Sequence, residues 1–281
     1  MGHEVQAIFT FNPSKHEKWE ISVDMLAKQY KIPLFLDDDF NSNRINQLKP
    51  DLIIVVGFRK IISGEILKIP KFGVIGLHAS LLPHYRGMAP LNWAIINGEK
   101  KTGITLFRMN EVIDSGEIIA QKETRINFNE TILEVKERII GLAVQLLEEN
   151  LPLIESGSES KIIHKEIGTY GCRRIPEDSL IDWNQSSLSI YNLIRGLEPS
   201  YAAYTFYNKK KIKILKAIME DTGMKYFGVP GQVGMINKDK SVVVITGDDH
   251  LIIIEVQVED KEPIRAGNVL NSTSIRLSCM P

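Results

Sequence analysis

Residues 75–87, with the sequence IGLHASLLPHYRG, combine a histidine with polar and basic side chains beside an apolar run. His78 ends the apolar run, and Ser80–Pro83 then forms a short, mostly apolar loop that closes with proline. Tyr85 and Arg86 follow, and a guanidinium can bind a carboxylate or a phosphate. A histidine in such a place can move protons near neutral pH, provided that a second group orients its ring.

A carboxylate suited to orient His78 follows in the segment ITLFRMNEVIDSGEII, where Asp114 lies in a loop between two predicted strands. A carboxylate and an imidazole from neighbouring strand ends can share one site, in which the carboxylate orients the ring. Ser80 could be mistaken for a nucleophile, but no base is spaced for it locally, so a turn hydroxyl is the safer interpretation.

Short apolar strands alternate with helical patterns through the first half of the chain, and these elements must position the site. The predicted strands are 5–11, 52–56, 74–77, 102–109 and 117–126, and the predicted helices are 16–30, 41–48, 64–69 and 90–97. This alternation is typical of a doubly wound α/β fold with a mostly parallel, Rossmann-like sheet. Such sheets bind ligands beyond the carboxyl ends of their strands, where His78 falls.

The second half of the chain changes from helical to mostly β patterning. Apolar residues recur every three or four positions over 130–156, which predicts a long helix that a Gly- and Ser-rich stretch ends. After one more helix at 187–197, short strands separated by turn residues suggest a small barrel. The sequence therefore predicts a catalytic domain over 1–160, a linker over 161–184 and a smaller, barrel-like β-rich domain over 185–281.

The composition of the 281 residues is balanced, with 35 acidic and 34 basic side chains and a net charge of -1. This charge gives no general attraction to nucleic acid or to anionic membranes. No run of 18 apolar residues and no signal-peptide pattern is present, and Cys172 and Cys279 form no zinc quartet. The absence of GxGxxG and Walker loops disfavours dinucleotide-dependent oxidoreductases and P-loop enzymes. We expect a reduced, cytoplasmic protein without a metal.

From HASLLPHYRG to DSGEII the chain resembles the formyltransferase family that uses 10-formyltetrahydrofolate. The family pattern is roughly N-x-H-x-S-L-L-P-x-x-R-G, followed further along by Asp-x-Gly. The chain matches it at His78, Ser80–Pro83, Arg86-Gly87 and residues 114–116. The resemblance continues through residues 173–206 and so covers nearly the whole chain. It implies the α/β catalytic domain and a C-terminal domain of the longer family members.

The resemblance also implies how the site works. A primary amine would attack the formyl carbon of 10-formyltetrahydrofolate, and His78 and Asp114 would be the catalytic residues that handle the proton and the oxyanion. The residues implied at the folate are Phe58, Arg59, Ile61, Leu82, Pro83, Val112 and Ile113. Those expected at the acceptor substrate are Ser80, Tyr85, Arg86 and Arg195. Neither a metal nor a covalent enzyme intermediate is implied.

Two positions depart from the family pattern. Gly76 stands where the family has an asparagine, and losing one oxyanion donor typically costs on the order of 100- to 1000-fold in rate. Folate-hydrolysing relatives also lack this asparagine, so 10-formyltetrahydrofolate hydrolysis is an alternative. The chain also starts as if the family's first strand, loop and helix were missing, which favours a truncated reading frame. An inactive remnant that only binds folate or sugar is a further alternative.

Charge is the main guide to the acceptor. Residues 201–281 hold eleven Lys and Arg against nine Asp and Glu, which is weak for binding a phosphate backbone. The run KKKIK at 209–213 is interpreted as a solvated hairpin turn, and the loop FNPSKHEKWE is shorter than in tRNA-specific relatives. A UDP- or dTDP-linked amino sugar is therefore the predicted acceptor, and methionyl-tRNA is the alternative. A homodimer is compatible with the sequence, although no residue pattern indicates it.

Overall fold

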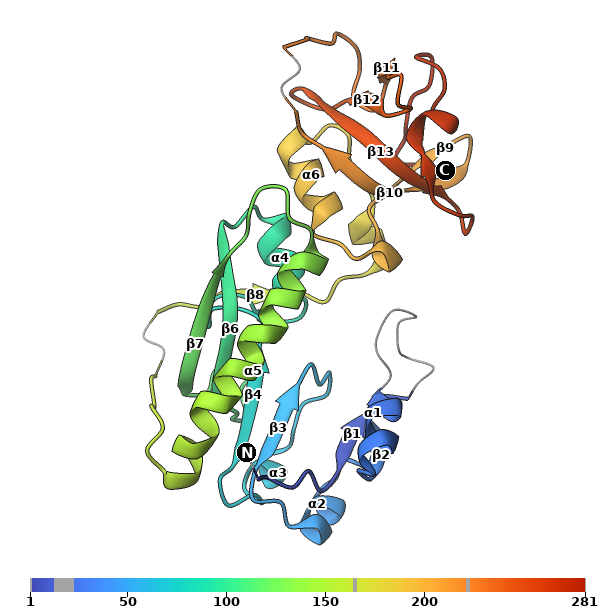
Figure 1. Ribbon diagram of the computed structural model, residues 1–281. Coiled ribbons are helices and arrows are strands. Elements are labelled where there is room, and N and C mark those ends of the chain that lie inside the picture. The colour runs from blue at the N-terminus through green and yellow to red at the C-terminus, as the bar shows by residue number, and fades with distance from the viewer. Residues whose placement is uncertain (1, 13–22, 164–165, 221–222, 281) are drawn as a thin grey trace. The chain divides into compact units, whose positions relative to one another are not determined.

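The computed structural model describes residues 2–12, 23–163, 166–220 and 223–280 (Figure 1). The chain packs as two compact units. The first unit comprises Met1–Gly87, Gly103–Glu123 and Ile139–Tyr170, and the second comprises Met88–Thr102, Thr124–Arg138 and Gly171–Pro281. Residues 16–22 of the first predicted helix, and most of the loop FNPSKHEKWE, lie outside the described residues.

The first part of the chain forms strands and helices in the predicted order. Its elements are β1 (Ile8–Thr10), α1 (Val23–Tyr30), β2 (Leu34–Leu36), α2 (Ser42–Leu48), β3 (Ile53–Val56), α3 (Gly64–Leu67), β4 (Val74–His78) and β5 (Arg86–Gly87). Side chains cap the short helices, because Asn41 accepts a hydrogen bond from Arg44 N and Ser63 accepts one from Ile66 N. The sequence pattern does not predict β2, since three residues are too short to display an alternation.

Two sheets carry the strands that lead to the site. The larger has the order β3-β4-β6-β7, where β6 is Lys101–Arg108 and β7 is Ile118–Arg125. β3 runs parallel to β4, whereas β6 is antiparallel to it, with Gly76 opposite Phe107 and His78 opposite Thr105. β1 and β2 form a separate parallel pair. The predicted α/β fold is confirmed, and its larger sheet is mixed.

The long helix α5 (Ile132–Ser156) follows these strands and matches the helix predicted over 130–156. Its buried apolar residues are Ile132, Val135, Ile139, Leu146 and Ile154. No helix in the described part of the chain is long and apolar enough to cross a membrane.

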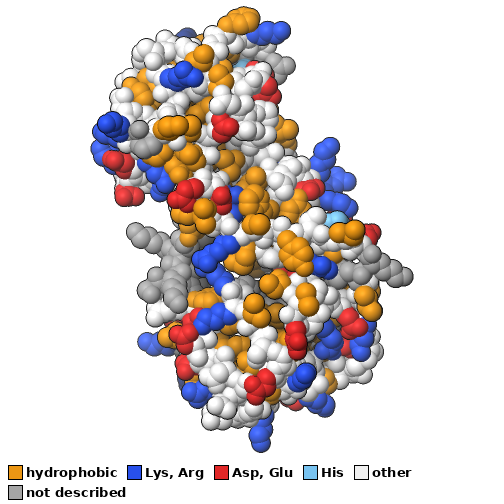
Figure 2. All heavy atoms as spheres, turned by 180° about the vertical axis from the view of Figure 1, so that it is seen from behind, with side chains coloured by type: hydrophobic (Ala, Val, Ile, Leu, Met, Phe, Trp, Pro, Cys, Tyr) orange, Lys and Arg blue, Asp and Glu red, His pale blue; other side chains and the backbone are white. Residues whose placement is uncertain are grey.

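Figure 2 shows acidic and basic side chains among hydrophobic ones over the visible face, as expected of a water-exposed surface.

The second unit contains the predicted β-rich domain. Its main elements are α4 (Pro90–Ile96), α6 (Ser187–Arg195), β9 (Tyr204–Tyr207), β10 (Lys210–Ile218), β11 (Val233–Ile236), β12 (Val242–Ile245), β13 (His250–Val258) and β14 (Ile264–Arg265). The short strand β8 (Tyr170–Gly171) precedes α6 in the chain. The strands pair antiparallel in the order β11-β12-β13-β10-β9, and β14 pairs with β13. This curled antiparallel sheet corresponds to the barrel-like domain that the sequence predicts.

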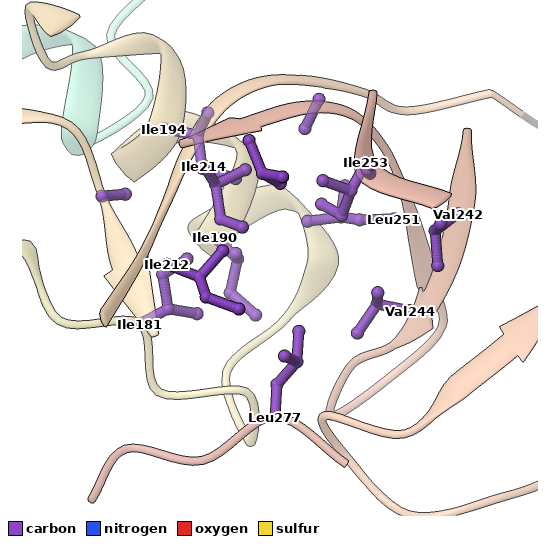
Figure 3. Close-up of a cluster of buried hydrophobic side chains, with 14 of the residues drawn as sticks. Ile181, Ile190, Ile194, Ile212, Ile214, Val242, Val244, Leu251, Ile253 and Leu277 are labelled. Atoms are coloured by element: carbon purple, nitrogen blue, oxygen red, sulfur yellow. The ribbon is translucent and has the colours of Figure 1, made fainter. Parts of the chain in front are cut away.

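A dense aliphatic cluster stabilises this curled sheet (Figure 3). Along β10, Ile212 and Ile214 point into the cluster, whereas Lys211 and Lys213 lie on the opposite face, as the two-residue period of a strand requires. Ile190 of α6 packs against the same cluster. The alternation of isoleucine and lysine therefore fixes which face of β10 is buried.

Candidate active site

Strand β4 places His78 at its carboxyl end. Gly73 adopts a φ of +73°, which turns the chain into the strand, and Val74 and Ile75 are fully buried. His78 is the last residue of the strand, and its side chain is only 10% exposed. The imidazole thus lies at the sheet edge where α/β proteins bind ligands.

Both nitrogens of the His78 ring face oxygen atoms. Nε2 lies 2.7 Å from the carbonyl oxygen of Tyr85. Because a carbonyl can only accept, Nε2 carries a hydrogen and donates it. Nδ1 lies 3.6 Å from a carboxylate oxygen of Asp114, which is too long for a hydrogen bond but close enough to attract the ring electrostatically once Nδ1 is protonated. The carboxylate therefore stabilises positive charge on the ring whenever the ring takes up a second proton.

Asp114 occupies a tightly folded loop between β6 and β7. Its backbone has a φ of +47°, and its Oδ2 accepts a hydrogen bond of 2.7 Å from Gly87 N. Asn110 closes the loop by accepting bonds of 3.0 Å from Val112 N and from the Ser115 hydroxyl. Sequence reasoning did not single out Asn110, although an asparagine two residues before a chain reversal is a recognisable turn signal.

An ion pair between a partly exposed arginine and a buried carboxylate anchors the start of the same loop. Arg108, the last residue of β6, donates from Nε to Glu159 over 3.0 Å and from Nη1 to the Phe72 carbonyl over 2.6 Å. The Glu159 side chain is 2% exposed. Burial opposes its ionisation, but the Arg108 hydrogen bonds keep the pKa of Glu159 below its usual value. Gly116 ends the loop where a Cβ would overlap the Arg108 carbonyl.

The position of the family asparagine, Gly76, is enclosed by the core. A Cβ at Gly76 would lie 2.7 Å from the Phe107 ring and 3.3 Å from Met109 Cγ. Phe107 is 3% exposed and packs with Leu82 and Ile118. The ring of Phe107 therefore fills the space that a side chain at position 76 would need.

Ser80 and Leu82 belong to a hydrogen-bonded turn after β4. Ser80 is 1% exposed, and its hydroxyl donates to the His84 carbonyl over 2.7 Å. Thr105 donates to the Ser80 carbonyl and accepts from Leu82 N. The Leu82-Pro83 peptide bond is cis. Ser80 thus makes the contacts of a turn hydroxyl, while Leu82 is buried.

The loop after β3 carries Phe58, Arg59 and Ile61. Phe58 is half-buried and its ring contacts those of Phe11 at 5.5 Å and Phe40 at 5.2 Å between centroids. The Arg59 guanidinium lies 5.5 Å from the Phe11 ring centroid. Ile61 is 77% exposed beside a cavity of about 230 Å³ that Phe58 and Phe40 also line.

Met109 connects the three segments implied at the folate. It packs against one apolar cluster, against which Phe58 also packs, and against another that includes Leu82. Val112 and Ile113 follow shortly after Met109 and are 59% and 51% exposed. Exposed apolar side chains at the edge of a sheet offer a surface that a flat aromatic ring system can cover.

The residues expected at the acceptor lie in different surroundings. Arg86 stands 5.7 Å from the Tyr170 ring centroid, and its Nε is buried without a partner among the described residues. Arg195 belongs to the second unit and is 7% exposed. It donates to the Asn192 side chain and to the carbonyl oxygens of residues 127 and 130, and burial lowers its pKa. Its hydrogen bonds are thus those of a structural cation.

The comparison with protein families matches both halves of the chain. Residues 11–151 match the formyl transferase family, and residues 174–274 match the formyl transferase C-terminal domain. The chain belongs to the formyltransferase family. No group of three or more His, Cys, Asp or Glu side chains that could hold a metal ion occurs in the described ranges of this formyltransferase.

Two curated relatives illustrate the range of the family. The methionyl-tRNA formyltransferase of Alkaliphilus oremlandii is 38% identical over 285 residues, which cover 98% of this chain and 90% of that protein. The bifunctional polymyxin resistance protein ArnA of Wigglesworthia glossinidia brevipalpis is 36% identical over 91% of this chain and 39% of its own length. The similarity to the first relative therefore runs through both parts of this formyltransferase.

Solved structures share the fold. HypX from Aquifex aeolicus, in complex with tetrahydrofolic acid, superposes with a TM-score of 0.68 at 22% identity, over 94% of this chain and 46% of HypX. An N-formyltransferase from Helicobacter canadensis was solved in complex with folinic acid and dTDP-3-aminofucose. It superposes with a TM-score of 0.65 at 20% identity, over 91% of this chain and 100% of that chain. The fold of this formyltransferase is thus shared with both structures.

Proposed function

We propose that the chain transfers the formyl group of 10-formyltetrahydrofolate to the amino group of methionyl-tRNA. The main support for this acceptor is that the chain is 38% identical to a methionyl-tRNA formyltransferase over 98% of its length. Further methionyl-tRNA formyltransferases are 33–37% identical over 88–98% of it. These relatives favour methionyl-tRNA over the amino sugar that charge alone predicts.

The residues around Met109 fit a folate donor. Phe58, Ile61, Val112 and Ile113 offer apolar side chains at the sheet edge beyond which His78 lies. When bound, 10-formyltetrahydrofolate supplies the formyl carbon that the acceptor amine attacks. The donor complexes of two structural neighbours contain related folates.

His78 and Asp114 would supply the acid–base chemistry of this transfer. The His78 ring is fixed by the Tyr85 carbonyl and faces Asp114, so the carboxylate stabilises the imidazolium that forms when the ring takes a proton. Since Nε2 already carries a hydrogen, Nδ1 would take the proton removed from the acceptor amine and release it again as tetrahydrofolate departs. Gly76 has no side-chain donor for the oxyanion, so within this pair only the N–H that forms on His78 Nδ1 after proton uptake can donate to it.

Basic and aromatic side chains of the second unit support a nucleic-acid acceptor. Lys211, Lys213 and Tyr201 line a hollow of about 500 Å³ beside β10, together with Glu259 and Asp260. Lysines at such a surface can contact phosphates, and an exposed tyrosine can stack on a base. Asn208 and Lys209, with positive φ values, form the turn between β9 and β10. Of the run KKKIK only Lys209 lies in this turn, because residues 210–213 are paired within β10 and Ile212 is buried, so the run is mostly strand and not a hairpin turn.

A nucleotide-linked amino sugar is the second candidate acceptor. Residues 201–281 carry a net charge of only +2, and basic and acidic side chains intermingle on the face shown in Figure 2. An acceptor as small as a sugar nucleotide needs few phosphate contacts, so a weakly basic surface suffices. Both candidates share the same donor and the same catalytic pair.

The decisive experiment measures release of tetrahydrofolate from 10-formyltetrahydrofolate with different acceptors. We expect release with methionyl-tRNA, accompanied by formyl-methionine after hydrolysis of the tRNA, and none with uncharged tRNA. Release only with UDP- or dTDP-linked amino sugars would replace the first candidate by the second. Equal release without an amine would identify a folate hydrolase instead.

A further inference from the structure

We propose that Thr169 is a positioning residue that holds the loop 83–87, and through this loop the imidazole of His78, in its working orientation. The kinetic consequence of this inference rests on the proposed formyl transfer. The structural consequence, the orientation of the His78 ring, does not depend on the acceptor.

The loop 83–87 contacts both members of the catalytic pair through its backbone. The Tyr85 carbonyl accepts from His78 Nε2 over 2.7 Å, and Gly87 N donates to Asp114 Oδ2 over 2.7 Å. These two contacts lie only two residues apart in the chain. A displacement of the loop would therefore move His78 and Asp114 relative to each other.

The backbone of this loop is not one that the chain adopts readily by itself. Tyr85 has a φ of +56°, in the left-handed region that favours glycine. Gly87, two residues on, has a φ of +86°. Such conformations persist where surrounding contacts hold them, and they cluster at functional sites.

Thr169 supplies these contacts through three hydrogen bonds. Its hydroxyl oxygen accepts from Tyr85 N over 2.8 Å, its carbonyl accepts from Arg86 N over 2.8 Å, and its own N donates to the Pro83 carbonyl over 3.2 Å. The preceding Gly168 lies so close that a Cβ there would overlap the Pro83 carbonyl. Thr169 is thus bonded to three of the four residues that precede Gly87.

The hydroxyl of Thr169 is the contact that acts most directly on His78. It bonds the amide of Tyr85, and the carbonyl of the same residue fixes the hydrogen on His78 Nε2. Replacing the hydroxyl by a methyl group leaves the Tyr85 amide without its acceptor, while the shape of the side chain is kept. The peptide units around Tyr85 would then rotate, and the ring would lose its fixed acceptor.

The test compares Thr169→Val with Thr169→Ser in the full-length protein. At alkaline pH, ¹⁵N chemical shifts of the histidine rings should show His78 with its hydrogen on Nε2 in the wild type and in Thr169→Ser. In Thr169→Val the two ring nitrogens should share the hydrogen. Because misplacement by about 1 Å can cost roughly 100-fold in rate, we expect Thr169→Val to lower kcat by about 10- to 100-fold with an unchanged KM for the donor.

Matched controls separate positioning from general loss of stability. Thr131→Val removes another loop hydroxyl, which donates to Glu134 over 2.9 Å, and should leave kcat and the His78 signal unchanged. If Thr169→Val does not fold, Gly168→Ala disturbs the same contact by pushing on Pro83 and should change the same His78 signal.

The outcomes are distinguishable from those of the proposed function. A His78 spectrum that is identical in the wild type, Thr169→Val and Gly168→Ala would overturn the role of Thr169, whatever the acceptor. Absence of turnover with every acceptor, combined with the expected change in the spectrum, would reject the proposed transfer and retain the positioning role.

Discussion

Asp114 combines two tasks at the scale of single residues, because one of its oxygens faces both the His78 ring and Gly87 N. The bond to Gly87 needs only an acceptor, whereas the interaction with the ring depends on negative charge. An asparagine at this position would keep the acceptor for Gly87 N and remove the negative charge, so one substitution can separate the structural role of Asp114 from its chemical role.

Asp114→Asn should therefore fold like the wild type and lose activity. Since a positioned acid–base group contributes about 100- to 10,000-fold, we expect kcat to fall by on the order of 100-fold or more. Tetrahydrofolate release under saturating donor measures this. Asp239→Asn, which changes an exposed turn carboxylate that accepts from Ser241, serves as the control. Equal activity of both variants would remove Asp114 from the mechanism.

Gly76 offers a second test at the residue scale. Asparagine at this position would press on the Phe107 ring, and overpacking a core costs typically about 1–3 kcal/mol. Gly76→Asn should lower the free energy of unfolding, and adding Phe107→Leu should recover part of it. If the amide then polarises the formyl group, the double variant should turn over faster than Phe107→Leu alone. A fully stable Gly76→Asn would mean that the Phe107 ring yields freely.

At the scale of elements, the start of α5 is held by a bidentate ion pair. Arg138 donates to both carboxylate oxygens of Glu130 over 2.8 and 2.9 Å, and also to the Arg125 carbonyl. The hydrogen bonds from Arg138, and others from Asn127, lower the pKa of Glu130 to about 2 against the opposing effect of burial. This pair ties the end of β7 to the first turns of the helix.

The pH dependence of stability should report this pair. The pKa of Glu130 is depressed from 4.5 in the unfolded chain to about 2 in the fold, so its contribution is complete above pH 4.5 and is lost as the pH falls through 2. Glu130→Gln should lower the free energy of unfolding at neutral pH by roughly 1.5–3 kcal/mol and flatten its acid dependence. Denaturant titrations at several pH values measure both. Glu137→Gln, on the exposed face of α5, should show neither change.

At the scale of the whole molecule, surface charge provides a test of the proposed acceptor. If methionyl-tRNA binds across Lys211 and Lys213, the double change to Glu should lower kcat/KM for tRNA. It should also reduce the slope of log affinity against log salt by about 0.9 for each lost phosphate contact. Lys238→Glu with Lys240→Glu removes the same charge from another turn and should have little effect. An equal response of both pairs would place the tRNA elsewhere.

The elements of the fold could be predicted because they depend on local patterns. The apolar run that ends at His78, the alternation of Ile212 and Ile214 with lysines, and the helical period after residue 130 are all visible in the sequence. Strand alternation also placed His78 and Asp114 at one sheet edge, and the structure places them 3.6 Å apart. Hydrophobic burial imposes these patterns on any sequence with this fold.

Discontinuous packing and long-range contacts could not be predicted in the same way. Residues 88–102 and 124–138 pack with the C-terminal part of the chain, a grouping that no sequence pattern indicates. Thr169 reaches Tyr85 across 84 positions, and Glu159 reaches Arg108 across 51. No local periodicity encodes such pairs, because they arise only when the folded chain brings distant segments together.

The sequence by itself determined the family and the order of most elements, and it brought His78 and Asp114, the proposed catalytic pair, to one sheet edge, since motifs and short-range hydrophobic periodicity are enough for this. Tertiary structure alone decided that Phe107 occupies the space at Gly76, that Arg195 bonds backbone carbonyls, and that a strained loop links His78 to Asp114. Strand register, burial and φ angles set these relations, and each of them is a property of the packed chain.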